Sequence, residues 1–179
     1  MAADLELLVP DFKSRVLALL ARCRARGVEM RPYNAVRSPL EQARLWRQSR
    51  SIEEIGRHSA ELQARGAPFL AGCLRRAGAQ NGDRVTDAPP GLSWHQWGEA
   101  VDCFWLVDAQ AEWSSRRLVH GQNGYRVYAD EARALGLHAG GHWQAFKDWP
   151  HVQRPAEGSP LRTMSMAEID AAMARCFGP

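Results

Sequence analysis

Residues 93–107, SWHQWGEAVDCFWLV, pass from a polar segment rich in tryptophan into an apolar run, and the fold and the candidate chemistry both centre on them. Ala100–Val107 is predicted to be a buried strand, because apolar residues fill it almost completely. Asp102 is the exception, and a carboxylate buried there is costly unless it is paired or bound to a metal ion. A turn at Gly98 followed by this strand would bring His95 and Asp102 to one point. The alternative is an arginine partner for Asp102, since the chain is rich in arginine.

A second short stretch, DWPH at residues 148–151, adds another imidazole and another carboxylate. Two imidazoles (His95 and His151) and one carboxylate (Asp102) are a zinc-type ligand set, and three protein ligands leave a fourth position for water. The remaining carboxylate, Asp148, is placed to accept a proton from that water. The pattern predicts a hydrolytic zinc site, although taken alone His151 also fits an exposed loop position.

The other histidines carry weaker signals. His138 and His142 have the spacing of a helical zinc site, but no glutamate follows the first, and the intervening Gly140-Gly141 disfavours a helix and favours a turn. We expect neither to bind metal, and His58 and His120 have no supporting context.

Arg37 directly precedes a predicted helix cap, so its side chain is a candidate clamp for a substrate carboxylate or an oxyanion. The alternative is a surface arginine. Five of the seven tryptophans lie near the candidate site in sequence and fit either the walls of a ligand groove or the core. They are Trp94, Trp97, Trp105, Trp143 and Trp149.

Length and composition indicate one domain over residues 1–179. The net charge of +3, with acidic and basic residues interleaved, argues against nucleic-acid binding. No apolar run approaches the ~18 residues of a membrane span. The segment Met1–Glu6 lacks the basic and apolar regions of a secretory signal, so synthesis in the cytoplasm without a signal peptide is expected. The four cysteines are expected to be buried thiols and not disulfides; they are Cys23, Cys73, Cys103 and Cys176.

Hydrophobic periodicity and capping signals predict an α+β fold, with a small antiparallel sheet that carries the zinc site and helices packed on it. Helices are expected over 11–26 (with Asp11 as N-cap), 39–48, from 52 onward, 69–78, 125–135 and 165–176. Capping boxes open three of them, at Ser38–Glu41, Ser51–Glu54 and Ser165–Glu168. Strands are expected over 28–34, 100–107 and 149–153, and a loop over 81–92. Pro150 predicts an edge position or irregular pairing for the last strand.

Four sequence elements together resemble a family of zinc peptidases. The family pattern S-x-H-x-x-G-x-A-x-D matches residues 93–102, and its acidic residue two positions before Pro-His matches Asp148. Residues 33–42 resemble its arginine-serine segment, and residues 136–143 resemble its glycine- and tryptophan-containing stretch. The family includes bacterial D-alanyl-D-alanine carboxypeptidases, vancomycin-resistance D-Ala-D-Ala dipeptidases, and phage or bacterial L-alanyl-D-glutamate endopeptidases. The resemblance covers about residues 12–153.

The resemblance implies roles for individual residues. The zinc ligands would be His95, Asp102 and His151, holding one Zn²⁺ per chain. Asp148 would be the general base, and Arg37 the clamp for the oxyanion or a carboxylate. A substrate groove is expected along Ser93, Trp94, Trp97, Trp143 and Trp149.

The resemblance further implies a peptidase that cuts peptidoglycan stem peptides between L-alanine and D-glutamate, because Asp148 stands where carboxypeptidases and dipeptidases usually carry glutamate. The alternatives are a D,D-carboxypeptidase or dipeptidase acting on D-Ala-D-Ala, and a zinc-bearing binding domain without activity, as in the related Hedgehog signalling domain. A monomer is expected. It would act on the cell wall or in the periplasm, released by a holin, if it is a phage-type endolysin, or in the cytosol if it recycles peptidoglycan. The departures from the endopeptidase pattern are Ala139, His142 and a longer helical segment over 51–80.

Overall fold

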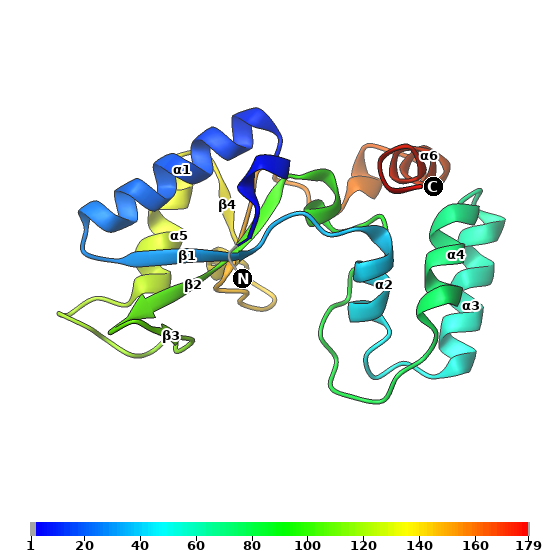
Figure 1. Cartoon of the computed structure of the whole chain (residues 1–179), viewed down its shortest axis with the longest axis horizontal. Coiled ribbons are helices and arrows are strands. Elements are labelled where there is room, and N and C mark those ends of the chain that lie inside the picture. The colour runs from blue at the N-terminus through cyan, green and yellow to red at the C-terminus, as the bar shows by residue number, and fades with distance from the viewer. Residues whose placement is uncertain (1–2, 179) are drawn as a thin grey trace. The chain divides into compact units, whose positions relative to one another are not determined.

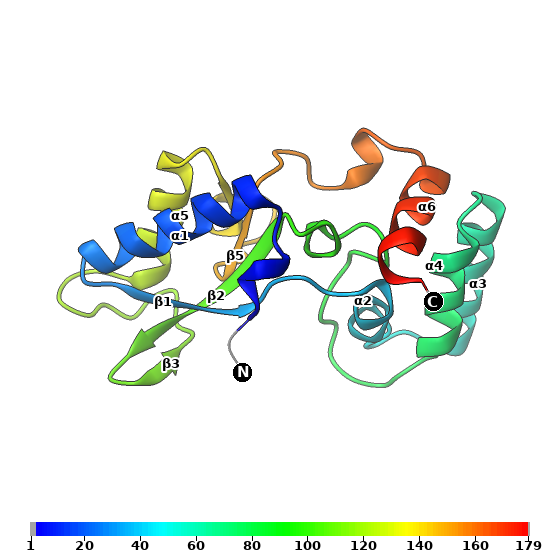
Figure 2. The same ribbon diagram turned by 45° about the horizontal axis from the view of Figure 1, so that its top comes forward.

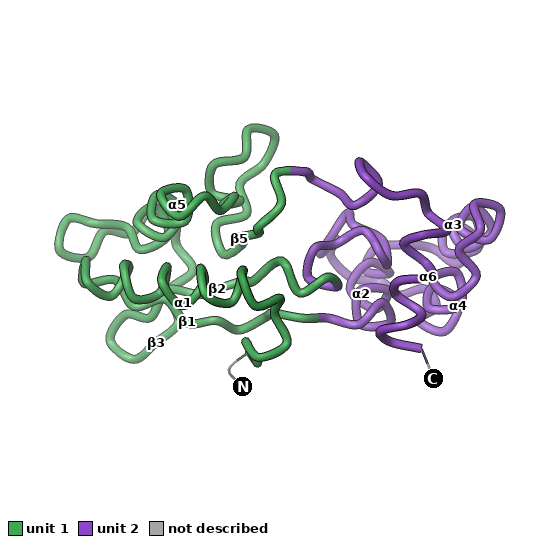
Figure 3. The backbone as a smooth tube through the Cα atoms, turned by 90° about the horizontal axis from the view of Figure 1, so that it is seen from above, with its two compact units in different colours: residues 1–36, 97–156 green, residues 37–96, 157–179 purple. Residues whose placement is uncertain are grey.

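The computed structural model describes residues 3–178, and the chain forms two compact units (Figure 3). Unit 1 consists of residues 1–36 and 97–156, and unit 2 of residues 37–96 and 157–179. The α+β class and the small antiparallel sheet are confirmed. That the whole chain is one domain stays a prediction.

Unit 1 is built on a five-stranded antiparallel sheet (Figures 1 and 2). Its strands are β1 (Glu29–Asn34), β2 (Ala100–Val107), β3 (Gln110–Glu112), β4 (His138–Ala139) and β5 (His151–Gln153). The order is β1-β2-β5-β4, and β3 pairs with β2. Helices α1 (Pro10–Ala25) and α5 (Gly124–Ala134) pack against each other and against the sheet. This packing forms the core of the unit.

Strand β2 divides its side chains between two faces of the sheet, as alternation along a strand requires. Val101, Cys103 and Trp105 belong to the core cluster that includes residues of α1 and α5. Asp102 lies on the opposite face, and Phe104 follows it there, only partly buried. Because directly paired residues of neighbouring strands point to the same side, the strand register decides which residues surround Asp102.

Unit 2 contains helices α2 (Pro39–Trp46), α3 (Ile52–Ala64), α4 (Pro68–Ala77) and α6 (Met166–Phe177). The three predicted capping boxes are confirmed, at the starts of α2, α3 and α6. Helix α4 has no side-chain cap of its own; instead Asp170 on α6 accepts hydrogen bonds from the backbone N–H groups of Leu70 (2.8 Å) and Phe69 (3.4 Å). This contact ties α6 to the start of α4. Short 3₁₀ turns complete the described chain at Leu5–Leu7, Trp94–Trp97, Gly140–His142 and Pro160–Arg162.

The structure corrects two local predictions. Helix α1 begins at Pro10 with Val9 as N-cap, because proline at the first position fits the fixed φ of a helix start, so Asp11 lies inside the first turn. Strand β5 lies between β2 and β4 and is not an edge strand. Pro150 is tolerated because it precedes the strand and contributes only its carbonyl oxygen, which accepts from the backbone N–H of Cys103 (3.0 Å).

Two further features differ from the expectations or extend them. All four cysteines are free thiols, but only three are buried; Cys176 is exposed near the end of α6. Strands β3 and β4 were not predicted, since two or three residues carry no periodic signal. Among residues 3–178, no helix is both long and apolar enough to span a bilayer.

Candidate metal centre

The candidate site is built on a carboxylate and an imidazole that face each other in unit 1. Asp102 on β2 and His151 on β5 are directly paired in the sheet, and His151 Nδ1 lies 3.0 Å from Asp102 Oδ1. Their side chains are only 12% and 10% exposed, respectively. The other carboxylate oxygen, Oδ2, accepts a hydrogen bond from Asn34 Nδ2 (2.9 Å). This amide contact orients the Asp102 carboxylate, with Oδ1 facing the imidazole.

The second ring nitrogen of His151 is held by an amide whose own orientation is fixed. Gln153 Nε2 donates to the carbonyl oxygen of Pro155 (2.8 Å), so Gln153 Oε1 points to His151 Nε2 at 3.0 Å. An oxygen can only accept, so Nε2 of the ring must carry the proton. Asp102 Oδ1, which faces Nδ1, is an acceptor as well, so without a metal ion the pair favours a proton on Nδ1 too. A bound cation would replace that proton and use the lone pair of Nδ1. A hydrogen bond of this kind on the far nitrogen is the usual support of a metal-binding histidine.

Burial and the neighbouring charges shift the pKa of His151 in opposite directions. Burial disfavours the charged ring and lowers its pKa, but the hydrogen bond and the charge of Asp102 raise it, with smaller contributions from Asp148 and Gln153. The net pKa of His151 is raised above its usual value. The site therefore favours positive charge at this position, as expected for a place that accepts either a proton or a metal cation.

His95 lies in the Trp94–Trp97 turn of unit 2, two residues before unit 1 resumes at Trp97. The turn is fixed locally: Gln96 Oε1 accepts from the backbone N–H of Gly91 (2.9 Å), and Trp94 Nε1 donates to the carbonyl of Glu157 (2.7 Å). His95 is almost fully buried. Its carbonyl accepts from the backbone N–H of Arg37 (3.3 Å), which ties the predicted clamp residue to the predicted ligand segment.

Among residues 3–178, His95, Asp102 and His151 are the histidine and acidic side chains that could hold a metal ion. Asp102 and His151 belong to unit 1 and His95 to unit 2, so His95 stays the predicted third ligand of the pair in unit 1. Two imidazoles and one carboxylate are donors that zinc prefers, and each residue has an identified hydrogen bond, of its side chain or its backbone, that fixes its position. The residues therefore fit the metal that the sequence implies.

The remaining histidines lie elsewhere. His138 is exposed on β4, and His142 Nε2 lies 3.3 Å from Asp130 Oδ1. His58 Nδ1 lies 3.2 Å from Glu61 in unit 2. None of them is among the three candidate ligands.

Asp148 lies in the loop that leads into β5, and two glycines allow this loop to approach closely. The backbone N–H of Asp148 donates to the carbonyl of Gly140 (3.2 Å), and the Asp148 carbonyl accepts from the N–H of His151 (3.2 Å). A Cβ atom on Gly140 would lie 2.9 Å from Asp148 Cβ, and one on Gly141 would lie 2.7 Å from the ring of Trp149. The Gly-Gly pair is therefore required for packing, and it holds the Asp148 loop beside His151.

The predicted groove tryptophans divide into different environments. Trp94 is buried, and Trp149 packs on the core of unit 1. Trp143 is only partly buried, and its ring centroid lies 5.2 Å from that of His151. Trp97 and Ser93 are also partly buried. Trp143 thus has a ring contact to a candidate ligand, and the groove itself stays a prediction.

Sequence reasoning missed the roles of two residues that shape the site, Asn34 and Gln153, and expected of Gly140 only that it forms a turn. Asn34 and Gln153 act through strand register: the first is paired with Asp102, and the second is two residues beyond His151 on the same face. The alternation of β5 could have identified Gln153, because residues i and i+2 share a face. The role of Asn34 could not be identified without the pairing between β1 and β2.

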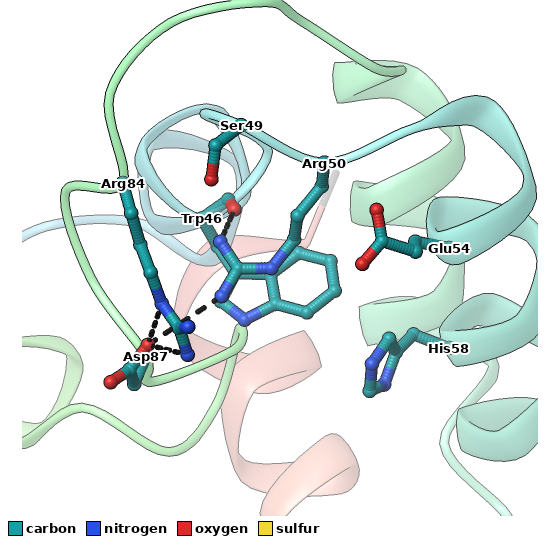
Figure 4. Close-up of a pocket in the computed structure, with 7 residues that line it drawn as sticks. All are labelled: Trp46, Ser49, Arg50, Glu54, His58, Arg84 and Asp87. Atoms are coloured by element: carbon teal, nitrogen blue, oxygen red, sulfur yellow. Dashed lines mark hydrogen bonds and ion pairs between the residues drawn. The ribbon is translucent and has the colours of Figure 1, made fainter.

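Unit 2 also carries a hollow of about 340 Å³ (Figure 4). It is lined by Trp46, Ser49, Arg50, Glu54, His58, Arg84 and Asp87. Arg50 stacks on the ring of Trp46, 4.0 Å from its centroid, and donates to the carbonyls of Trp46 and Thr86. Arg84 and Asp87 pair with each other. These charged groups hold the 81–92 loop against the end of α2, which is a structural role.

The fold and the site together define an α+β protein with buried histidine and aspartate side chains that could hold a metal ion. A family model described as VanY, D-alanyl-D-alanine carboxypeptidase, matches residues 6–132, which is more than half of the chain. The chain belongs to this peptidase family. The matched range includes Arg37, His95 and Asp102 and ends before Asp148 and His151.

The chain is also similar to three individual proteins. The chain is 31% identical over 77 residues to the peptidoglycan L-alanyl-D-glutamate endopeptidase CwlK of Bacillus subtilis. That match covers 41% of this chain and 46% of CwlK, so the chain spans less than half the length of this relative. Among solved structures, the chain is similar to the Serratia marcescens L-Ala D-Glu endopeptidase ChiX, with a TM-score of 0.44, 20% identity, and coverage of 83% of this chain and 81% of ChiX. It is also similar to a VanY D,D-pentapeptidase variant from a VanB-type vancomycin resistance cassette in complex with Zn(II), with a TM-score of 0.46, 19% identity, and coverage of 82% and 71%.

Proposed function

We propose that this chain is a zinc-dependent peptidase that cuts the stem peptide of peptidoglycan between L-alanine and D-glutamate. The observation that carries the proposal is the Asp102–His151 pair, in which Gln153 accepts from Nε2 and leaves Nδ1 facing the carboxylate, with a second carboxylate, Asp148, in the adjoining loop. The 31% identity with an L-alanyl-D-glutamate endopeptidase supports the choice of bond.

Each residue of the site has its own role in this reaction. His95, Asp102 and His151 would hold the zinc ion, which when bound polarises a carbonyl and lowers the pKa of a water molecule. Asp148 accepts the proton of the attacking water and passes one to the leaving amine. Arg37 donates hydrogen bonds to the oxygen on which negative charge develops. Asn34 and Gln153 keep the carboxylate and the imidazole in their orientations.

The second candidate function is a D,D-carboxypeptidase or dipeptidase acting on D-Ala-D-Ala. The description of the matching family favours it. A clamp for a free C-terminal carboxylate is what this reaction would need, and Arg37 is the residue available for that role as well. A zinc-bearing binding domain would need neither Asp148 nor Arg37, so their presence argues for catalysis.

Digestion of purified peptidoglycan followed by mass spectrometry tests the proposal. Stem peptides with a new N-terminal D-glutamate, and glycan that retains L-alanine, are the expected products. Free D-alanine as the main product would favour the second candidate. If Asp148→Asn and wild-type protein both leave the substrate uncut while binding it, the chain is a binding domain.

A further inference from the structure

Three aromatic side chains form an exposed cluster on the sheet of unit 1. Tyr33 on β1, Phe104 on β2 and Trp113 just after β3 have ring centroids 5.4–6.2 Å apart. Trp113 is 56% exposed and Tyr33 is 39% exposed. We call these three residues the aromatic triad. Large aromatic side chains that gather on an exposed surface are typical of ligand-binding sites, because a protein without a ligand or partner usually buries such groups in its core.

The aromatic triad lies on the same face of the sheet as Asp102 and His151. Phe104 is two residues from Asp102 along β2, so both point to the same side. Ala111 pairs with Leu106, which places Trp113, two residues further on, on that side as well. The ring contacts of Tyr33 with Phe104 and Trp113 place it there too.

A β-bulge in β1 explains how Tyr33 and Asn34 serve both places. The register pairs Pro32 with Cys103 but Asn34 with Asp102, so Tyr33 is the extra residue. A bulge re-aims the side chains that flank it. Here it brings Asn34 to the carboxylate of Asp102 while Tyr33 meets Phe104. The bulge therefore contributes a residue both to the candidate metal centre and to the aromatic triad, which lie on the same face of the sheet.

The aromatic rings of the triad offer the kind of surface on which a sugar ring packs. The C–H groups on one face of a pyranose pack on aromatic rings, and its hydroxyl and acetamido groups need polar neighbours at the rim. Arg31 is paired directly opposite Phe104, and its exposed guanidinium lies beside Glu29 (2.5 Å). The triad thus has an apolar centre and a polar rim on one side.

We propose that the aromatic triad is the subsite for the N-acetylated amino sugar that carries the stem peptide. This inference rests on the proposed function, since it names the part of peptidoglycan that the same site would hold. The cut bond and the sugar are separated by one alanine and one lactyl group, about 7 Å of extended chain. Two residues along a strand, from Asp102 to Phe104, also span about 7 Å.

The spacing favours the L-alanyl-D-glutamate bond over the terminal one. The D-Ala-D-Ala bond lies three residues further from the sugar, which adds roughly 10 Å. If the sugar occupied the aromatic triad and the stem peptide were extended, the D-Ala-D-Ala bond would therefore lie beyond the metal centre. Occupation of the subsite by the sugar would therefore select the bond next to it.

Binding to glycan without peptide tests the subsite separately from catalysis. The probe is a set of glycan fragments from which the stem peptides have been removed, titrated into zinc-free protein and followed by calorimetry. Wild-type protein should bind, and Trp113→Ala should weaken binding by roughly tenfold, the usual effect of losing one stacking ring. Leu118→Ala, at a similarly exposed position, is the matched control and should bind as wild type.

A kinetic comparison completes the test. The substrates are a disaccharide-bearing stem peptide and the same peptide N-acetylated without sugar, and Trp113→Ala should reduce the preference for the first by about tenfold in kcat/KM. Absence of glycan binding by wild-type protein, or equal binding by Trp113→Ala, overturns the inference. So does a Trp113→Ala variant that binds glycan normally but loses self-association, which would assign the triad to a second copy of the chain. Glycan binding that depends on Trp113, without any peptide cleavage, would support the subsite and reject the proposed function.

Discussion

His151 and Asp102 face each other across neighbouring strands, with Nδ1 of the ring 3.0 Å from Oδ1 of the carboxylate. The pairing of the two strands brings them together, because the residues are far apart in sequence. Each is oriented from behind by an amide, Gln153 for the ring and Asn34 for the carboxylate. The orientation of the pair is therefore fixed without a metal ion, and Nδ1 and Oδ1 are the two atoms that a bound cation would meet.

The ligand assignment predicts how zinc is lost. Purified protein should contain about one zinc ion per chain, and His95→Ala or His151→Ala should lose metal and activity together, because two protein ligands do not hold a catalytic zinc. Elemental analysis after dialysis measures the content. His138→Ala and His142→Ala are the controls and should keep their zinc. Full occupancy in either ligand variant would refute the assignment.

Gln153 should matter for zinc although it does not bind the metal. Gln153→Ala removes the acceptor that fixes the proton on His151 Nε2, and loss of such a support typically weakens metal affinity by about 10- to 100-fold. Competition with a chelator of known affinity gives the value. Gln144→Ala, at an exposed position of the same unit, should change nothing. Equal zinc affinity in the Gln153 and Gln144 variants would show that the hydrogen bond is incidental.

Asp148 is predicted to move a proton and not to bind metal. Asp148→Asn keeps size and hydrogen bonding but cannot accept a proton, so turnover should fall by at least ~100-fold while zinc stays bound. Steady-state kinetics and zinc content are measured on the same sample. Near-normal turnover in Asp148→Asn would show that another residue is the general base. Glu99 would be the next candidate, although its carboxylate is paired with Arg154.

The raised pKa of His151 predicts the direction of a pH effect in zinc-free protein. A ring whose pKa is higher in the folded state than in the unfolded state binds its proton more tightly when folded. The stabilisation is fully present below the unfolded value, near 6.5, and is lost as pH rises through the higher folded value. Melting temperatures of EDTA-treated protein should show this trend, and His151→Gln should remove it. An identical pH profile in both proteins would contradict it.

Arg50 is predicted to stabilise unit 2 and to have no part in catalysis. Its side chain is 10% exposed, stacks on Trp46 and donates to the carbonyl of Thr86 (3.2 Å). Arg50→Ala leaves buried acceptors without a donor and should cost about 2–3 kcal/mol in the free energy of unfolding. Denaturant unfolding measures this loss. Arg57→Ala, on an exposed position of α3, should change stability little, and equal loss in both variants would reject the role given to Arg50.

Local sequence signals were sufficient for most helices and for the central strand. The three capping boxes opened helices where predicted, because a serine and a glutamate three residues later satisfy each other's backbone donors without help from the rest of the chain. The apolar run Ala100–Val107 is β2 with the predicted bounds. The Asp102–His151 pair was also expected from sequence, since a carboxylate within an apolar run requires a partner, and the role of both residues as zinc ligands stays a prediction.

Tertiary structure alone decided what surrounds those ligands. Asp102 and His151 are 49 residues apart, and their contact depends on the pairing of β2 with β5, which no local pattern encodes. The bulge at Tyr33, which supplies Asn34 to the carboxylate and one ring to the aromatic triad, appears only when β1 is laid against β2. The division of the tryptophans between core and surface has the same origin, because burial is set by residues distant in sequence. The sequence thus determined which side chains are available for the candidate site, and the register of the sheet determined how Asp102 and His151 face each other.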